Sequence, residues 1–308
     1  MKKVSVLVAC YNAHLYLEQC LSSLFNQTLD DFEIIIVDDG STDGSAKLIE
    51  QLCTERENVT FLLRKENLGV IKTRNQLLKM AHERSEFIAW CDADDIYHHN
   101  KLELQYHFLK KNKEYIGCGT WYKKIGITNR KIIKFSNSYA INIFTCFGSP
   151  IGFPTFMHKN QLNIFFNENL ESSEDYQFIT DISMRGKLTN LRHTLTFYRV
   201  HNAQESTQNH VRQNKVHQEI AYANCKLQFQ EYEKFYPLFL KPDIWDEKSL
   251  DVLLSFISSL KNNPRDQLLA SILDYRMLVY NKKKYRFLLK YLTKRGLRFL
   301  NIYQLYIR

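Results

Sequence analysis

Short apolar runs alternate with helix-like segments along the first third of the chain, and this alternation constrains the fold more than any other feature. The segment after the first run places Leu17, Leu21 and Leu24 on one helix face. Strands that are apolar on both sides and separated by helices form a parallel sheet covered on each side. We therefore expect an α/β fold with a doubly wound, mostly parallel sheet. The expected strands are 4–10, 32–37, 59–63 and 86–91.

Polar residues follow three of these runs at the point where each expected strand ends. Tyr11 follows the first run, Asp39 lies just beyond the second, and Asp92 and Asp94 follow the fourth. In open α/β sheets, ligands bind beyond the carboxyl ends of the strands. We expect these side chains to meet at one edge of the sheet and to form a ligand site there.

The pattern changes in the second half of the chain. The alternation weakens after about residue 115, and all five prolines lie at Pro150 or later. The stretch 148–154, with two glycines and two prolines, is typical of an exposed, shaped loop. From about Val211, apolar residues recur at helical spacing. We expect one domain at 1–205 and a helical C-terminal region at 206–308.

The positive charge is concentrated at the end of the chain. Residues 281–308 hold nine of the 42 basic residues and no acid, which leaves 33 basic against 33 acidic residues elsewhere. The aromatic residues of this tail are of the kind that stacks nucleobases, but they mix with leucines at a spacing typical of an amphipathic helix. We expect the tail to dock on an anionic membrane surface or on the core, and we expect no nucleic-acid partner.

The seven cysteines are odd in number and widely spaced, and no two form a Cys-x-x-Cys pair. They indicate reduced structural thiols, not a zinc site or a redox motif. The first apolar run is too short for a signal peptide, and no run approaches the roughly 18 to 20 residues that span a bilayer. We expect a cytoplasmic protein with peripheral contact on the inner face of the membrane through its tail.

Two acidic pairs are candidates for chemistry. Asp92 and Asp94 emerge together from a buried strand, and such a pair suits Mg²⁺ or Mn²⁺ carrying a diphosphate. Taken alone, the triplet also fits an ordinary turn. Glu174 and Asp175 precede an apolar helical pattern and fit a helix N-terminus, where acids favour the dipole. They equally fit a general base that takes a proton from an attacking hydroxyl.

Six motifs in order resemble the large family of inverting glycosyltransferases with the GT-A fold, which build bacterial lipopolysaccharide, capsule and similar glycans. The resemblance covers roughly the first two thirds of the chain. The motifs are Val4–Asn12, Phe32–Asp43, Asn67–Gly69 with Arg74 and Asn75, Asp92–Asp95, Ser173–Tyr176, and Tyr198–His201.

The resemblance implies a nucleotide-diphospho-sugar transferase fold for the chain. Residues 1–205 would be the catalytic domain, with a nucleotide-sugar half at 1–100 and an acceptor half at 101–205. The implied activity is transfer of a sugar from a UDP-sugar to a hydroxyl of a glycan or lipid-linked acceptor. Inversion at the anomeric carbon of an α-linked donor gives a β linkage.

Roles on the donor side also follow from the resemblance. Ala9 and Tyr11 would flank the nucleobase, and Asp39 would accept the imide N–H of uracil, an edge that thymidine donors share. Arg74 would contact the diphosphate or the neighbouring acids. Asp92, with Ala93, would lie beside the ribose or the donor sugar.

The resemblance assigns the remaining roles to the metal and the acceptor. Asp94 would be the direct ligand of Mn²⁺ or Mg²⁺, with Asp95 supporting it. His201 would close over the diphosphate or bind the metal. Asp175 would be the catalytic base, and Glu174 would contact the acceptor.

Three other classes of protein deserve comparison. A dinucleotide oxidoreductase is excluded because the turn after the first strand, residues 11–14, lacks the glycine fingerprint. A nucleotidyltransferase also uses acids and a metal, but the chain has no glycine-rich basic loop at that turn. A non-catalytic protein that binds a nucleotide sugar or an anionic surface is the third alternative, and retention of all the acids argues against it.

Overall fold

The computed structural model describes residues 1–202, 210–240, 247–260 and 264–280. These residues form two compact units. The first unit comprises 1–134 and 151–213, and the second comprises 135–150 with the described residues from 214 onward. The predicted tail, 281–308, lies outside the described residues.

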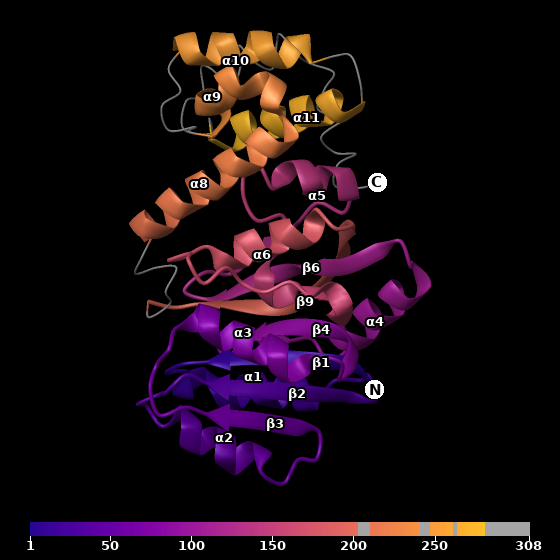
Figure 1. The fold of residues 1–308 in the computed structure, drawn as a ribbon, viewed down its shortest axis with the longest axis vertical. Helices are drawn as coiled ribbons and strands as arrows, with labels where there is room; N and C mark the ends of the chain where they lie inside the picture. The colour runs from indigo at the N-terminus through magenta and orange to yellow at the C-terminus, as the bar shows by residue number, and fades with distance from the viewer. Residues whose placement is uncertain (203–209, 241–246, 261–263, 281–308) are drawn as a thin grey trace. The chain divides into compact units, whose positions relative to one another are not determined.

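A mixed sheet forms the centre of the first unit, with strand order β3-β2-β1-β4-β8-β6-β9-β5 and β7 beside β6. Figure 1 shows β3, β2, β1 and β4 in this order. The pairs β2–β3, β1–β2, β1–β4 and β6–β9 are parallel. Strand β8 runs antiparallel to both β4 and β6. The expected parallel sheet is therefore confirmed in its first half and is mixed in its second. The strands are β1 Lys2–Cys10, β2 Phe32–Asp38, β3 Val59–Leu63, β4 Ser85–Asp92, β5 Ile96–Tyr97, β6 Tyr115–Gly126, β7 Arg130–Ile132, β8 Met157–Lys159 and β9 Lys187–Val200.

Helices cover both faces of this sheet because its central strands are apolar on both sides; β2 is buried along its whole length. On one face, residues such as Val6 and Ile34 share a core with α1, α2 and α4. On the other face, α3 packs on β1 and β2, and Trp90 meets Phe178 of α6. The helical elements are α1 His14–Phe25, α2 Ser45–Cys53, α3 Val70–Ala81, α4 Lys101–Lys111, α6 Glu174–Ser183, and the short turns η1 Phe153–Thr155 and η2 Asn160–Leu162.

Strand register brings the predicted ligand residues to one edge. Cys10 pairs with Asp38, and Ala9 pairs with Asp92, so β1, β2 and β4 end side by side. The turn after β2 lies directly on a neighbouring loop, because a Cβ added to Gly40 would come within 2.6 Å of the Glu66 backbone. The φ of Gly40 is +74°, which glycine adopts at low cost.

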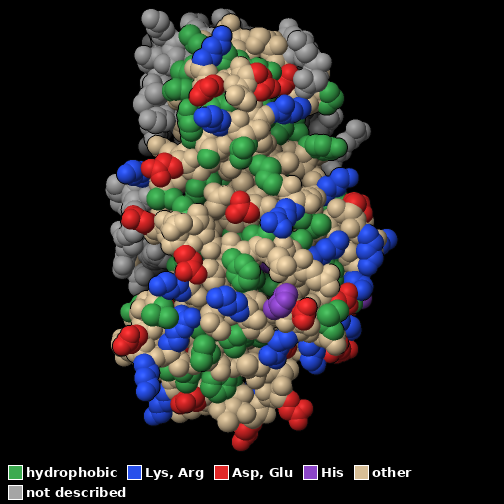
Figure 2. Space-filling model, viewed as in Figure 1, with side chains coloured by type: hydrophobic (Ala, Val, Ile, Leu, Met, Phe, Trp, Pro, Cys, Tyr) green, Lys and Arg blue, Asp and Glu red, His purple; other side chains and the backbone are tan. Residues whose placement is uncertain are grey.

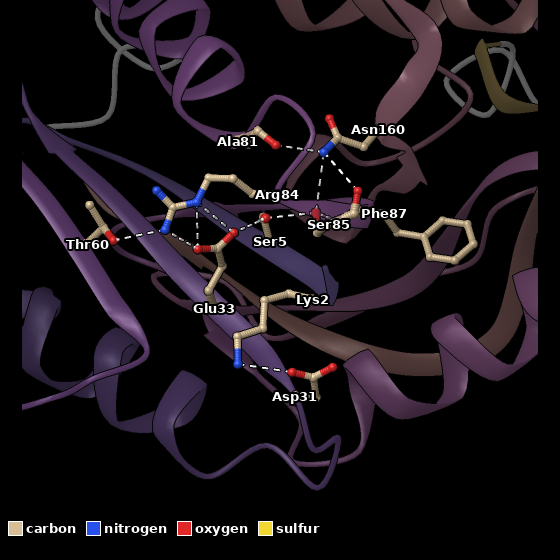
Figure 3. Close-up of polar contacts among 10 residues, drawn as sticks. All are labelled: Lys2, Ser5, Asp31, Glu33, Thr60, Ala81, Arg84, Ser85, Phe87 and Asn160. Atoms are coloured by element: carbon tan, nitrogen blue, oxygen red, sulfur yellow. Dashed lines mark hydrogen bonds and ion pairs between the residues drawn. The ribbon is translucent and has the colours of Figure 1, made fainter.

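The opposite edge of the sheet carries a buried polar network (Figure 3). Ser5 Oγ bridges Glu33 Oε1 and Ser85 Oγ, both at 2.7 Å, and Arg84 Nη2 donates to Glu33 Oε2 at 2.6 Å. Asn160 Nδ2 donates to the carbonyl of Ser85 at 3.0 Å. Burying a carboxylate such as Glu33 is costly unless it is paired and hydrogen-bonded. These contacts therefore pair and hydrogen-bond the buried Glu33 carboxylate at this end of the strands.

The second unit is helical, as the spacing of its apolar residues predicts. Leu253, Phe256 and Leu260 are all buried. Residues 135–150 belong to this unit, although the sequence places them in the acceptor half, because Asn224 Nδ2 donates to Thr145 O at 2.9 Å and α11 packs on α5. The helical elements are α5 Ser138–Phe144, α8 His210–Gln228, η3 Gln230–Phe235, α9 Tyr236–Leu240, α10 Glu247–Ser259 and α11 Pro264–Tyr280.

Surface side chains in Figure 2 show acidic and basic groups interspersed, with hydrophobic side chains in small groups between them. This mixture agrees with the balance of 33 acids and 33 basic residues outside the tail. Among the described residues, no helix has the length and apolar character needed to cross a membrane.

Candidate active site

The acidic turn after β4 is held in place by the end of β9. The backbone N–H of Arg199 donates to Asp95 Oδ1 at 2.8 Å, and Arg199 Nε donates to the carbonyl of Asp94 at 2.9 Å. The Arg199 guanidinium also lies 4.8 Å from the Tyr16 ring. Asp95 is fully buried, and burial raises the pKa of its carboxyl well above the usual range. Asp95 thus supports the turn from inside the fold.

The structure brings Asp94 and His201 together across more than a hundred residues of sequence. Asp94 Oδ2 and His201 Nε2 are 2.9 Å apart. The Tyr16 ring of α1 lies 4.7 Å from the imidazole and helps to fix its position. The side chains of Asp94 and His201 are 19% and 18% exposed.

This pair fits one side of a divalent cation site. An octahedral Mg²⁺ with ligands at about 2.1 Å places neighbouring ligand atoms about 3 Å apart, and the Asp94 and His201 atoms have that separation. Among the described residues, no group of three or more His, Cys, Asp or Glu side chains is arranged to hold a metal. A cation at Asp94 would take its other ligands from phosphate oxygens and water, as Mg²⁺ commonly does.

Arg74, in α3, lies between two carboxylates. Its Nη1 donates to Glu174 Oε1 at 2.5 Å, and its Nη2 lies 3.3 Å from Asp92 Oδ1. The guanidinium stacks over Phe153 at 4.2 Å, which limits its freedom. Burial raises the pKa of Asp92 to about 6 and raises that of Glu174, although Arg74 opposes both shifts. Arg74 thus contacts both carboxylates, and its role toward the diphosphate stays a prediction.

Asp175 occupies the first turn of α6, next to Glu174. The residue before them, Ser173, has a φ of +57°, which turns the chain sharply into the helix. Asp175 Oδ1 accepts the backbone N–H of Tyr176 at 2.7 Å. The Asp175 carboxylate is close enough to raise the pKa of Asp92 and of Glu174. The start of α6 therefore faces the acidic end of β4.

Asp39 is buried and accepts more hydrogen bonds than the sequence suggests. It is 2% exposed, and its Oδ1 accepts from Arg64 Nη1 at 2.7 Å and from the N–H of Leu68 at 3.0 Å. Its Oδ2 accepts from the N–H of Gly69 at 2.8 Å. Asp39 therefore anchors the loop before α3. Its proposed contact with uracil would have to use the remaining acceptor capacity of Oδ2.

The other predicted donor contacts lie at the same edge. Ala9 pairs in register with Asp92, and Tyr11 follows β1 with half of its surface exposed, at 51%. Ala93 is buried between the two aspartates at 6% exposure. An exposed aromatic ring beside a strand end offers a flat face to a nucleobase. The nucleobase-binding roles of Ala9 and Tyr11 stay predictions.

Two basic residues near the site are not indicated by the sequence alone. Arg199 belongs to the motif Tyr198–His201. Its hydrogen bond to the acidic turn, however, depends on the pairing of β9 with β5, which no local pattern predicts. Burial lowers the pKa of Lys134 to about 8, and the nearby Asp175 carboxylate opposes this shift. The basic residues near Lys134 in the sequence are the only local pattern that could have indicated it.

The fold and the acidic edge define the chain as a member of the GT-A fold class. A family model described as glycosyl transferase family 2 matches residues 5–200, and the chain belongs to this family.

Relatives agree with this assignment. A glycosyltransferase of Rickettsia bellii is 34% identical over 206 residues, covering 64% of this chain and 29% of that protein. A glycosyltransferase of Haemophilus influenzae is 29% identical over 236 residues, covering 72% of each chain. The poly(ribitol-phosphate) beta-N-acetylglucosaminyltransferase TarP of Staphylococcus aureus is 29% identical over 231 residues, covering 70% and 67%. The chain thus spans less than a third of the Rickettsia relative.

Solved structures share the fold. S. aureus TarS 1-349 in complex with UDP-GlcNAc has a TM-score of 0.63 at 20% identity, over 96% of this chain and 92% of that one. The mannosyltransferase PcManGT of Pyrobaculum calidifontis, in complex with GDP-Man and Mn2+, has a TM-score of 0.57 at 15% identity, over 91% and 88%. At these identities the likeness concerns the fold alone.

Proposed function

We propose that this chain transfers a sugar from a UDP-sugar to a hydroxyl of a glycan or lipid-linked acceptor, with inversion and formation of a β linkage. The acceptor would belong to lipopolysaccharide, capsule or a related bacterial glycan. One observation carries the proposal: Arg74 joins Asp92, at the expected donor edge, to Glu174, which adjoins Asp175. The acids proposed to act on the donor and those proposed to act on the acceptor therefore lie close together.

The proposed reaction is a single displacement at the anomeric carbon. The acceptor oxygen forms a bond to that carbon, and the bond from the carbon to the diphosphate oxygen breaks, releasing UDP. Asp175 takes the proton of the attacking hydroxyl. Its Oδ1 already accepts from Tyr176, and Oδ2 makes no hydrogen bond within the described part of the chain. We therefore place the proton on Asp175 Oδ2.

The leaving group carries negative charge, so its stabilisation is the second requirement. Asp94 and His201 would hold Mn²⁺ or Mg²⁺, and such a cation neutralises charge that develops on the diphosphate. The solved complex of PcManGT with GDP-Man and Mn2+ shows this fold with both a sugar nucleotide and a metal. Arg74 supplies fixed positive charge at the same edge through its contact with Asp92.

A donor screen tests the proposal. Purified protein is incubated with UDP-, dTDP- and GDP-sugars and Mn²⁺, and release of nucleoside diphosphate is measured. We expect slow hydrolysis of a UDP-sugar above the others. NMR of the first transfer product then gives the anomeric configuration. Release of nucleotide from none of the donors, or an α-linked product from an α-linked donor, would contradict the proposal.

We also propose, on sequence alone, that 281–308 contacts anionic lipid; these residues lie outside the described residues. Each basic residue near an anionic surface contributes about 1 kcal/mol of binding. Sedimentation with phosphatidylglycerol vesicles compares the full chain with a truncation after residue 280. We expect salt-sensitive binding by the full chain only. Equal binding by the two proteins would refute the membrane contact.

A further inference from the structure

One long segment of the chain carries no acid. Residues 115–167 contain six Lys and Arg residues and no Asp or Glu. Outside the tail, basic and acidic residues are otherwise balanced. Such a local excess creates a positive potential that attracts anions. The transfer chemistry proposed above uses none of these six residues.

Four of the six lie on the two-stranded ribbon formed by β6 and β7. Lys124 pairs directly with Arg130, and Lys123 pairs directly with Lys131. Like charges placed opposite each other across two strands are destabilising. Within the described residues, none of these four side chains forms an ion pair with an acid. The ribbon therefore keeps an electrostatic strain that an anionic ligand would relieve.

The two like-charge pairs lie on opposite faces of the ribbon because side chains alternate along a strand. Lys124 shares its face with Tyr198, its partner in β9, and its ammonium lies 5.9 Å from that ring. The Tyr122 and Tyr198 rings meet edge to face at 5.9 Å. On the other face, Lys131 lies over Trp121 at 4.7 Å.

The Lys124 face leads toward the proposed catalytic base. Gly152, in the loop before η1, approaches the ring of Tyr122 so closely that an added Cβ would lie 2.9 Å from it. The Asp95 carboxylate and the Arg130 guanidinium both act on the pKa of Tyr122. Lys134 follows β7 and is influenced by Asp175 and by Lys124. Lys134 is thus within electrostatic range of both Lys124 and Asp175.

We propose that Lys124, Arg130 and Lys134, with Tyr122, bind a phosphate-bearing acceptor chain that runs along this face and presents a hydroxyl to Asp175. This inference rests on the proposed transferase function and names its acceptor class, a polyanionic polyol- or sugar-phosphate polymer. Arginine and lysine are the usual donors to phosphate oxygens. Tyr122 and Tyr198 meet edge to face, so no nucleobase can stack between their rings.

Two double charge reversals test the proposal. Lys124→Glu/Arg130→Glu changes the proposed face, and Lys123→Glu/Lys131→Glu changes the other face of the same ribbon. Each replaces one like-charge pair by another, so the net charge and the cross-strand repulsion stay matched. Melting temperatures of the two variants should therefore agree. The probe is a synthetic ribitol-phosphate octamer, with uncharged maltooctaose as the control ligand.

We expect the first variant to bind the octamer about 10- to 100-fold more weakly, since two charged contacts are lost. The second variant should stay within about twofold of wild type, because screened, distant charges contribute little. Equal losses in the two variants would overturn the proposal. So would binding of a DNA octamer, or of phosphatidylglycerol vesicles, that depends on the same face as strongly. UDP binding by the wild-type protein is measured separately. This measurement distinguishes failure of the proposed transferase function from failure of the proposed acceptor site on the ribbon.

Discussion

Arg74 Nη1 lies 2.5 Å from Glu174 Oε1, and both side chains are about nine-tenths buried. The same guanidinium reaches Asp92 at 3.3 Å. An arginine fork can hold two carboxylates in fixed geometry, whereas a lysine offers a single point charge. The helix that begins at Glu174 is therefore tied to the end of β4 by one side chain. Asp175, the residue after Glu174, is held near the end of β4 by this link.

Loss of Arg74 should destabilise the protein. Arg74→Met leaves the buried Glu174 carboxylate without its partner, and breaking a buried pair in this way costs about 3–5 kcal/mol. Urea unfolding of Arg74→Met and wild type measures the difference. Adding Glu174→Gln to the first change removes the unpaired charge and should restore part of the loss. A double variant no more stable than Arg74→Met would show that the pair does not govern this end of α6.

Removal of the divalent cation should weaken donor binding. Asp92, Asp94, Glu174 and Asp175 place several negative charges at one edge, and a diphosphate adds more. Calorimetry with UDP is run with Mn²⁺ and then with excess EDTA. We expect at least tenfold weaker binding in EDTA, because a bound cation is the largest local charge in such a site. Uridine, which lacks the phosphates, is the control and should show no dependence on the metal.

The first half of the fold could be predicted because its central strands β1, β2 and β4 are buried on both faces. The run at Phe32–Val37 and the alternation with helices suffice to indicate parallel strands. The second half could not be predicted in the same way. Strand β8 has three residues and is antiparallel to β4 and β6, so its place depends on distant pairing and not on local pattern.

The site shows the same division. Asp94 and Asp175 stand out locally, as acids at a strand end and a helix start. The 2.9 Å contact of Asp94 with His201 has no local signature, and the resemblance implies only that His201 closes over the diphosphate or binds the metal. The face formed by Lys124 and Arg130 was not foreseen, because cross-strand pairing creates it. Residues brought together by long-range register are the part that sequence patterns leave open.

Lys101 provides a test of stability against pH. It is fully buried, its Nζ has no hydrogen-bond partner in the described part of the chain, and it lies 3.8 Å from the Tyr97 ring. Burial lowers the pKa of Lys101 to about 7, from 10.5 in the unfolded chain. Between these values the unfolded chain binds a proton that the folded chain does not, so this group makes stability rise with pH.

Lys101→Met removes the amine and keeps a flexible apolar side chain. We expect the variant to be more stable than wild type, with the largest gain near pH 7 and below. The gain should shrink as the pH rises from 7 toward 10.5, above which the wild-type amine is neutral in both states. Thermal melting of both proteins from pH 6 to 9.5 measures this difference. A gain that does not change with pH would show that the folded lysine keeps its ordinary pKa.

Asp94 and Asp175 should fail in different ways when substituted. Asp94 lies against His201 at the proposed cation site, and Asp175 lies at the start of α6 beside Glu174. Asp94→Ala should remove the effect of Mn²⁺ on UDP binding and abolish both sugar transfer and slow donor hydrolysis. His201→Ala should reproduce the loss of the metal effect in milder form, because the carboxylate ligand remains.

Asp175→Asn keeps the size of the side chain and the acceptor that binds the Tyr176 N–H, but it cannot take a proton. Donor affinity should therefore stay near that of wild type, while transfer falls by about 10²- to 10⁴-fold, the usual contribution of a positioned base. Calorimetry with UDP and a transfer assay separate the two effects. Transfer by Asp175→Asn within a few-fold of wild type would reduce Asp175 to a helix-start residue. Glu174 would then have to supply the base, although its carboxylate is already bound to Arg74 at 2.5 Å.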